Sequence, residues 1–163
     1  MPAVVVMGVS GSGKTSVARI LADGLSAQFV EADALHPRAN KDKMAGATPL
    51  TDADRLPWLR LVAEVMRERT AAGADVVVAC SALRRDYRDV LRTAGDDIRF
   101  VLLSVPLPEL ERRLDLREGH FMPTDLLGSQ LATLEPFSDD DPGVVVDASG
   151  TVDETVEAVL AVV

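Results

Sequence analysis

Alternating apolar and polar stretches divide the chain into strands and helices. Runs rich in β-branched residues predict five buried strands, at Ala3–Met7, Gln28–Glu31, Ala74–Cys80, Ile98–Ser104 and Gly143–Asp147. Apolar residues at helical spacing predict helices between them, at 14–25, 38–44, 51–71, 81–92, 107–116, 125–134 and 152–163. Strand, helix and strand follow one another within the first thirty-odd residues, which predicts an α/β fold with a parallel sheet and right-handed crossovers.

The helix expected at 51–71 has its own start signal. Thr51 and Asp54 have the spacing of a capping box, in which each residue caps the other's backbone amide. Pro57 comes too late to be a first-turn proline, so we expect a kink or a restart there. Trp58 follows directly and is expected to pack in the core or at its rim.

Composition narrows the class of protein. The 163 residues are 47% hydrophobic and 26% charged, which is typical of one globular domain. The net charge of −9 argues against a nucleic-acid partner. The single cysteine, Cys80, rules out an internal disulfide and is typical of a reducing compartment. No apolar run approaches the ~18 residues of a membrane span, and no basic leader precedes the first strand, so we expect a cytoplasmic protein without a membrane partner.

A phosphate-binding loop is predicted between the first strand and the first helix, where Gly8–Thr15 matches the P-loop pattern G-x-x-x-x-G-K-[ST]. Glycines let the backbone curl with its amides pointing inward, and the helix that follows adds the positive end of its dipole. Lys14 could reach the β- and γ-phosphates, and the Thr15 hydroxyl could ligate Mg²⁺. The expected nucleotide-binding residues are Gly8, Ser10, Gly11, Ser12, Gly13, Lys14, Thr15 and Ser16.

The carboxyl ends of the second and third strands carry the next candidates. No aspartate ends the third strand, so the metal-handling role moves toward Asp33 or Glu31 after the second. Asp33 could ligate Mg²⁺, accept a proton from a substrate hydroxyl, or only form a turn. Ser81 faces the same edge, and Arg84, in the first turn of the next helix, is expected to point into the cleft.

The segment 117–123 has the composition of a mobile cover, with Arg117 at its edge and a glycine at its centre. Loops that close over phosphates commonly deliver an arginine to the transferring group. Further along, 137–142 is expected to be an acidic surface loop. The turn 148–150 is expected at the P-loop edge of the sheet, where a base could stack.

These blocks together resemble the gluconokinases, a family of P-loop small-metabolite kinases. The blocks that carry the resemblance are G-V-S-G-S-G-K at 8–14, D-A-L-H-P at 33–37 with Asn40, Lys43 and Met44, P-L-T-D-A-D-R at 49–55 with P-W-L at 57–59, C-S-A-L-R-R at 80–85 with Y-R-D at 87–89, and Arg117 with G-H-F-M at 119–122, S-Q at 129–130 and T-L-E at 133–135. The chain departs from the family at Ala32, where glycine is usual, and in the order Thr15-Ser16 after the lysine.

The resemblance implies one P-loop kinase-like domain over residues 1–163. Its layers would be α/β/α, with a five-stranded parallel sheet and a small helical lid at about 117–135. It implies ATP and Mg²⁺ as cofactors and phosphorylation of the 6-hydroxyl of D-gluconate. Lys14, Asp33 and Arg117 would be catalytic, and Thr15 would hold the metal. The substrate-binding residues implied are Asp33, His36, Lys43, Arg55, Ser81, Arg84, His120 and Gln130.

Several points stay open at this level. An arginine is expected to grip the substrate carboxylate, but the sequence does not say which one. A homodimer is an open expectation. A related kinase of shikimate or of nucleoside monophosphates is the first alternative. A nucleotide-dependent switch is the second alternative, and the sequence gives it little support. N-K-D-K at 40–43 matches a guanine motif only in part, and D-L-L-G at 125–128 is misplaced for a switch motif.

Overall fold

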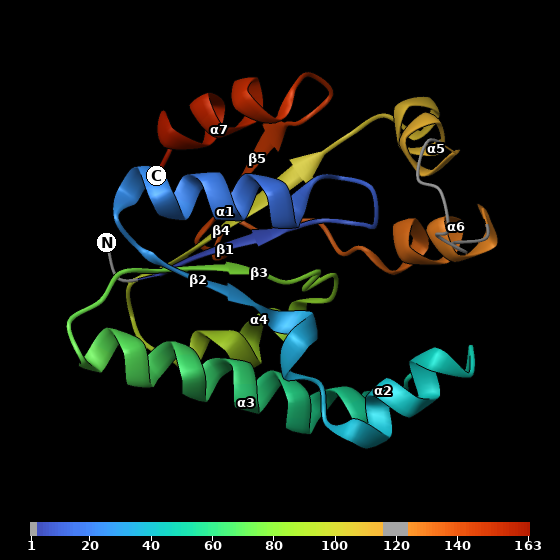
Figure 1. The fold of residues 1–163 in the computed structure, drawn as a ribbon, viewed down its shortest axis with the longest axis horizontal. Helices are drawn as coiled ribbons and strands as arrows, with labels where there is room; N and C mark the ends of the chain where they lie inside the picture. The colour runs from blue at the N-terminus through green and yellow to red at the C-terminus, as the bar shows by residue number, and fades with distance from the viewer. Residues whose placement is uncertain (1–2, 116–123) are drawn as a thin grey trace.

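The structure is a computed structural model that describes residues 3–115 and 124–163 (Figure 1). Its strands are β1 (Ala3–Met7), β2 (Gln28–Glu31), β3 (Val76–Ala79), β4 (Ile98–Ser104) and β5 (Gly143–Asp147). Its helices are α1 (Lys14–Leu25), the 3₁₀ helix η1 (Ala32–Leu35), α2 (Arg38–Ala45), α3 (Asp52–Ala71), α4 (Arg85–Arg92), α5 (Leu107–Asp115), α6 (Thr124–Thr133) and α7 (Val152–Leu160).

The five strands form one parallel sheet, as the sequence predicted, and the structure gives their order as β2-β3-β1-β4-β5. Helices α1 and α7 cover one face, and α3 and α4 cover the other (Figure 1). The strand order reverses next to β1, which is the topological switch point of an open α/β sheet, and ligands bind there at the carboxyl ends of the strands. The P-loop leaves β1 at this point.

The core has one layer on each side of the sheet. Alternate residues of β1 supply both layers: Val5 and Met7 pack toward α3 and α4, whereas Val4 and Val6 pack toward α1 and α7. This explains why β1 reads as a continuous apolar run, with all five residues buried. Trp58 is 4% exposed and belongs to the α3 layer, which confirms its expected place in the core.

Helices α5 and α6 lie beyond the carboxyl end of the sheet, and α2 lies at the same end on the α3 side (Figure 1). A small apolar cluster holds α5 and α6 to the loops of the site, through Leu110, Leu127, Val9 and Leu83. Helix α6 is the described part of the segment expected to form the lid, and 117–123 lies outside the described residues. Among the described helices, none is long and apolar enough to cross a membrane.

The structure differs from the sequence-based expectations at two places. The helix expected from Ser81 begins only at Arg85, with Arg84 at its N-cap. Residues 81–83 are not helical because Ala82 adopts a left-handed φ of 45° and a buried side chain, Arg88, binds their carbonyl groups. At Pro57, where a kink or a restart was expected, the restart is absent, since α3 is one helix from Asp52 to Ala71.

The N-terminus of α3 follows the prediction. The Thr51 hydroxyl accepts from the Asp54 amide at 3.2 Å, and the Asp54 carboxylate accepts from the Thr51 amide at 2.9 Å. This capping box fixes the start of the helix one turn before Pro57. The missing amide of Pro57 therefore costs one hydrogen bond in a helix that is already nucleated.

Candidate active site

The P-loop forms a tight turn between β1 and α1. Gly8, Gly11 and Gly13 have φ angles of 149°, 84° and 92°, which favour glycine. A Cβ on Gly8 would lie 2.7 Å from the Ser12 hydroxyl oxygen, so a side chain there would displace that group. The Ser12 hydroxyl donates to the carbonyl of Val9 at 2.7 Å and closes the loop.

The first turn of α1 supplies the charged side of this loop. Gly13 is the N-cap, so the free amides and the positive end of the helix dipole face the loop. The Lys14 ammonium group donates to the carbonyl of Val9 at 3.2 Å, so it folds back over the loop. Thr15 and Ser16 are exposed at the start of the helix. The arrangement is that of an anion-binding nest.

Helix α6 contacts the P-loop through Gln130. The backbone amide of Ser10 donates to Gln130 Oε1 at 2.8 Å. A glutamine expected from the sequence on the substrate side of the site thus contacts the loop that binds phosphate. The contact joins the described part of the segment expected to form the lid to the P-loop.

Helix α5 contacts the same loop through Arg113, which sequence reasoning missed. Its guanidinium donates to the carbonyl of Gly11 at 3.2 Å and to two carbonyls of the turn 148–150, at 2.6 and 3.2 Å. This confirms that the turn lies beside the P-loop. The only sequence signal for Arg113 was its spacing of four residues from Glu109, with which it pairs at 3.1 Å. That spacing predicts a helix ion pair and nothing more.

The carboxylates after β2 lie near the same edge. The Thr15 hydroxyl donates to Glu31 Oε2 at 2.7 Å. Burial raises the pKa of Cys80 to about 12. The negative charge of Asp33 also raises this pKa, and the positive charge of Lys14 lowers it. The charges of Asp33, Glu31 and Lys14 therefore gather around the buried thiol at the end of β3.

These groups fit a magnesium ion. Mg²⁺ usually takes one or two protein oxygens and fills its remaining positions with phosphate and water. The Thr15 hydroxyl and the Glu31 carboxylate offer two hard oxygen donors within 2.7 Å of each other. The described residues contain no group of three or more His, Cys, Asp or Glu side chains that could hold a metal by themselves.

His36 is buried on the α3 side of this edge. Its ring stacks on Trp58 with centroids 4.0 Å apart, and the Trp58 indole donates to the carbonyl of Ala32 at 2.7 Å. The Asn40 side-chain amide donates one hydrogen bond to the carbonyl of Asp54, and this fixes its orientation. Its nitrogen then also faces His36 Nδ1, at 3.2 Å. Nδ1 is then an acceptor, and the neutral ring carries its proton on Nε2.

The pKa of His36 is lowered, first by burial and then by the charges of Arg55 and Lys41. Burial and both cations favour the neutral ring. His36 is thus held as a neutral residue whose Nε2 carries the proton. That proton is suited to a substrate hydroxyl.

Two of the basic residues expected to bind substrate are paired in this structure. The Lys43 ammonium lies 2.7 Å from the Asp54 carboxylate, and this hydrogen bond is the first cause that lowers the pKa of Asp54 to about 2. Arg84 lies 3.1 Å from Asp52, 3.2 Å from Asp86 and 3.6 Å from Glu135. Three carboxylates therefore surround the guanidinium of Arg84, and its expected place in the cleft stays a prediction.

Arg55 is held differently. Its Nη1 donates to the hydroxyl of Tyr87 at 3.2 Å, and its guanidinium lies 5.7 Å from the centre of the Tyr87 ring. Within the described part of the chain, no ion pair joins Arg55 to a carboxylate. It is half-buried at the N-terminal end of α3, so its positive charge stays available.

Ser81 is half-buried at the end of β3, in the non-helical segment that Arg88 holds. Arg88 is fully buried and donates to the carbonyls of Ala82, Leu83 and Pro136 at 3.2, 3.2 and 3.5 Å. It is also 3.9 Å from Asp141, whose side chain is only 2% exposed. The loop 137–142 is thus not wholly a surface loop.

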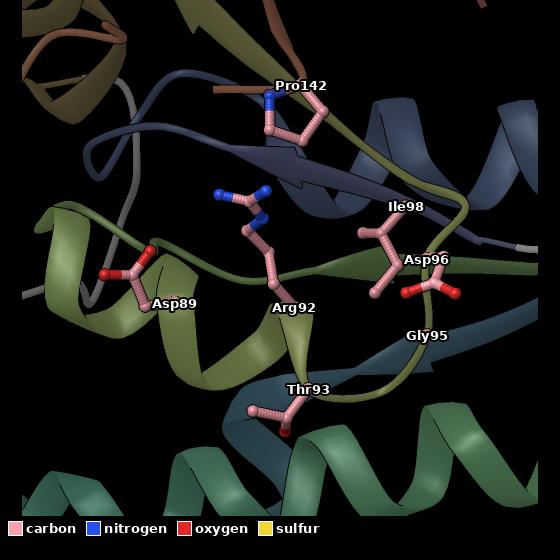
Figure 2. A pocket seen from close by; sticks show the side chains of 7 residues that line it. All are labelled: Asp89, Arg92, Thr93, Gly95, Asp96, Ile98 and Pro142. Carbon is pink, nitrogen blue, oxygen red and sulfur yellow. The ribbon is translucent and has the colours of Figure 1, made fainter. Parts of the chain in front are cut away.

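The last two expected residues, Arg117 and His120, lie outside the described residues. A separate cavity of about 380 Å³ lies far from the P-loop, at the amino end of β4 (Figure 2). Its lining includes Asp89 and Arg92 of α4 and Asp96 of the loop before β4. Parallel strands place this end opposite the P-loop edge, so the cavity is not part of the phosphate site.

Comparisons with known proteins agree with this geometry. The family described as an AAA domain matches residues 4–137. A gluconokinase from Gluconobacter oxydans is 52% identical over 159 residues, covering 96% of this chain and 88% of the relative. The crystal structure of a sugar kinase from Janibacter has a TM-score of 0.91 at 47% identity and covers 99% of this chain and 93% of that one. The crystal structure of a gluconokinase from Sinorhizobium meliloti has a TM-score of 0.88 at 45% identity and covers 98% of this chain and 90% of that one.

The fold and the P-loop site define a P-loop kinase, an enzyme that transfers a phosphoryl group to a small molecule. Gluconokinases that are more than 40% identical to this chain along nearly the whole length of both chains then identify the family within this class. The chain belongs to the gluconokinase family.

Proposed function

We propose that this protein transfers the γ-phosphoryl group of ATP to the 6-hydroxyl of D-gluconate, giving 6-phospho-D-gluconate and ADP. The observation that carries the proposal is the similarity to gluconokinases over nearly the whole chain, which includes the acceptor blocks as well as the P-loop. The geometry supports it, because a phosphate-binding nest and an arginine that forms no ion pair with the described carboxylates, Arg55, occur at one end of the sheet.

On the nucleotide side, the amides of the P-loop and of the first turn of α1 hold the ATP phosphates. Lys14 swings from the Val9 carbonyl to the phosphates, where it offsets the charge of the transferred group. Thr15 and Glu31 would hold Mg²⁺, directly or through water, and the ion would supply neutralisation of the phosphate charge.

On the acceptor side, Asp33 accepts a proton from the 6-hydroxyl while that oxygen attacks phosphorus. The new P–O bond forms as the bond to the β-phosphate oxygen breaks, and the electron pair leaves with ADP. His36 donates from Nε2 to a substrate hydroxyl, and Ser81 and Gln130 complete the polar wall. Arg117 and His120 of the lid segment are proposed to join them when substrate is bound.

Arg55 is the arginine that we propose for the substrate carboxylate. A guanidinium can bind a carboxylate with two parallel hydrogen bonds. Lys43 and Arg84 already face carboxylates of the protein. Arg55 is held only by a neutral hydroxyl among its described hydrogen bonds. It therefore gains most from an incoming anion.

The proposal is tested by ADP release in a coupled assay with gluconate, shikimate and nucleoside monophosphates as acceptors. Gluconate is expected to give the highest kcat/KM, and a higher value for another acceptor would refute the substrate. Asp33→Asn is expected to lower kcat by about 10²–10⁴-fold, because it removes the base, and to leave KM for ATP within about twofold. Asp23→Asn, at an exposed position near the end of α1, is the matched control. Near-normal kcat in Asp33→Asn removes Asp33 from the catalytic role.

A further inference from the structure

The hydroxyl of Tyr87 joins α3 to α4 next to the proposed carboxylate site. It lies 2.8 Å from Asp52 Oδ1 and 3.2 Å from Arg55 Nη1. Asp52 and Arg55 both belong to the first turn of α3, and Tyr87 belongs to the first turn of α4. The tyrosine is 8% exposed, so the ring is fixed by the core and only its polar end reaches the site.

The direction of these hydrogen bonds follows from chemistry. A phenol has one proton to donate, and a carboxylate can only accept, so the proton goes to Asp52. The lone pairs of the oxygen are then left for the guanidinium of Arg55, which can only donate. Asp52 is ionised at neutral pH, because the hydrogen bond from Tyr87 and the charges of Arg84 and Arg55 lower its pKa. Burial and Asp52 raise the pKa of Tyr87, which keeps the phenol neutral.

A direct Asp52–Arg55 pair would orient the guanidinium but would also neutralise it. In the structure, the orientation of Arg55 and the neutralisation of Asp52 come from different groups. The charge of Asp52 is opposed by Arg84 at 3.1 Å, on the other side of the network, while Arg55 receives only a neutral acceptor. Arg84 also lies 5.4 Å from the centre of the Tyr87 ring, so the tyrosine contacts both guanidinium groups. Arg55 is held in place and keeps its charge and its remaining N–H groups.

We propose that Tyr87 is a positioning residue for the acceptor carboxylate: its hydroxyl, fixed by Asp52, aims Arg55 without neutralising it. This inference rests on the proposed function, since it concerns how the enzyme distinguishes an acidic acceptor from a neutral one. Tyr87 does not touch the reacting atoms. It acts through Arg55, and its effect is on binding of the acid and not on the transfer step.

The test is Tyr87→Phe, which removes one oxygen atom and keeps the buried ring. KM for gluconate is expected to rise about five- to tenfold, because one hydrogen bond to a charged group is lost, with kcat and KM for ATP within about twofold. D-Glucitol, which has a CH₂OH group in place of the carboxylate, is measured as a competitive inhibitor against gluconate. Its inhibition constant is expected to be unchanged. Asp86→Asn is the matched control, because Asp86 is exposed and contacts Arg84 without contacting the hydroxyl.

The outcomes separate the possibilities. A Tyr87→Phe enzyme with unchanged KM for gluconate overturns the inference. An equal weakening of gluconate and D-glucitol, or a large fall in Tm, means that Tyr87 only supports the fold and also overturns it. Arg55→Lys is expected to raise the gluconate KM further, and adding Tyr87→Phe to it is expected to change little. Absence of gluconate phosphorylation by the wild type overturns the proposed function, and the inference with it.

Discussion

Arg88 allows a sharp test of how the site is supported. It is fully buried in α4 and donates to three main-chain carbonyls in two separate segments, 82–83 and 136. Its guanidinium also lies 5.2 Å from the centre of the Phe137 ring and 3.9 Å from Asp141. Arg88→Met keeps much of the volume and the unbranched stem but removes every donor.

The size of the effect follows from the groups left behind. Each buried carbonyl that loses its donor costs about 1–3 kcal/mol, and Asp141 loses its nearby cation. Removing one partner of a buried pair typically costs about 3–5 kcal/mol in all. For a chain of this length that corresponds to a fall in Tm of about 6–20 °C. The single tryptophan, Trp58, is buried and its fluorescence reports unfolding in urea or on heating.

The test is informative because the two kinds of replacement differ. Replacing a whole buried ion pair by apolar residues of similar volume is neutral or stabilising in some proteins, whereas Arg88→Met removes one partner only. An Arg88→Met protein as stable as the wild type would therefore refute the reasoning, because it would mean that the carbonyls find other partners. Arg85→Met is the control on the same helix. Arg85 is exposed, so its replacement is expected to change the free energy of unfolding by less than about 0.5 kcal/mol.

Two further predictions concern pH. The folded pKa of His36 lies below its usual 6.5, so the unfolded chain takes up the proton first, and stability is expected to fall as pH drops from about 6.5 toward the folded pKa. Urea unfolding at pH 7.5 and 5.5 should show a larger loss in the wild type than in His36→Gln, and equal losses would contradict the assignment. The pKa of Asp54 is lowered to about 2, so its contribution is complete above about pH 4 and lost as pH falls through 2. Thermal melting should show Asp54→Asn less stable than the wild type at pH 7, with the gap closing toward pH 2.

The strands and the nucleotide side were predictable because their signals are local. A strand buried on both faces must be apolar throughout, and β1 is. A backbone nest needs glycine at fixed positions, and the φ angles of Gly8, Gly11 and Gly13 explain why the pattern is readable from the sequence alone. The capping box of Thr51 and Asp54 belongs to the same class of signal. Each of these depends on residues within a few positions of one another.

The acceptor side could not be predicted in the same way. Arg84 and Arg88 lie four residues apart in one arginine-rich stretch, and nothing local distinguishes them. Arg84 meets Asp52, which is 32 residues away, and Arg88 meets Pro136, which is 48 residues away. The unexpected φ of Ala82 also has a distant cause, since the carbonyls of 82–83 turn toward a guanidinium on the following helix. The start of α4 was misplaced for that reason.

The pairing of the basic residues explains how an acidic chain can select an anion. In this chain of net charge −9, several cations pair with a carboxylate of the protein itself, as Lys43, Arg84 and Arg113 do. A cation that is neutralised in this way adds little attraction for a substrate, whereas an unpaired arginine without support would lose orientation. A neutral acceptor such as the Tyr87 hydroxyl meets both needs, because it fixes Arg55 and leaves its charge intact. In an acidic chain, an anion is then attracted where a cation keeps its charge, as Arg55 does here and as the P-loop does for phosphate.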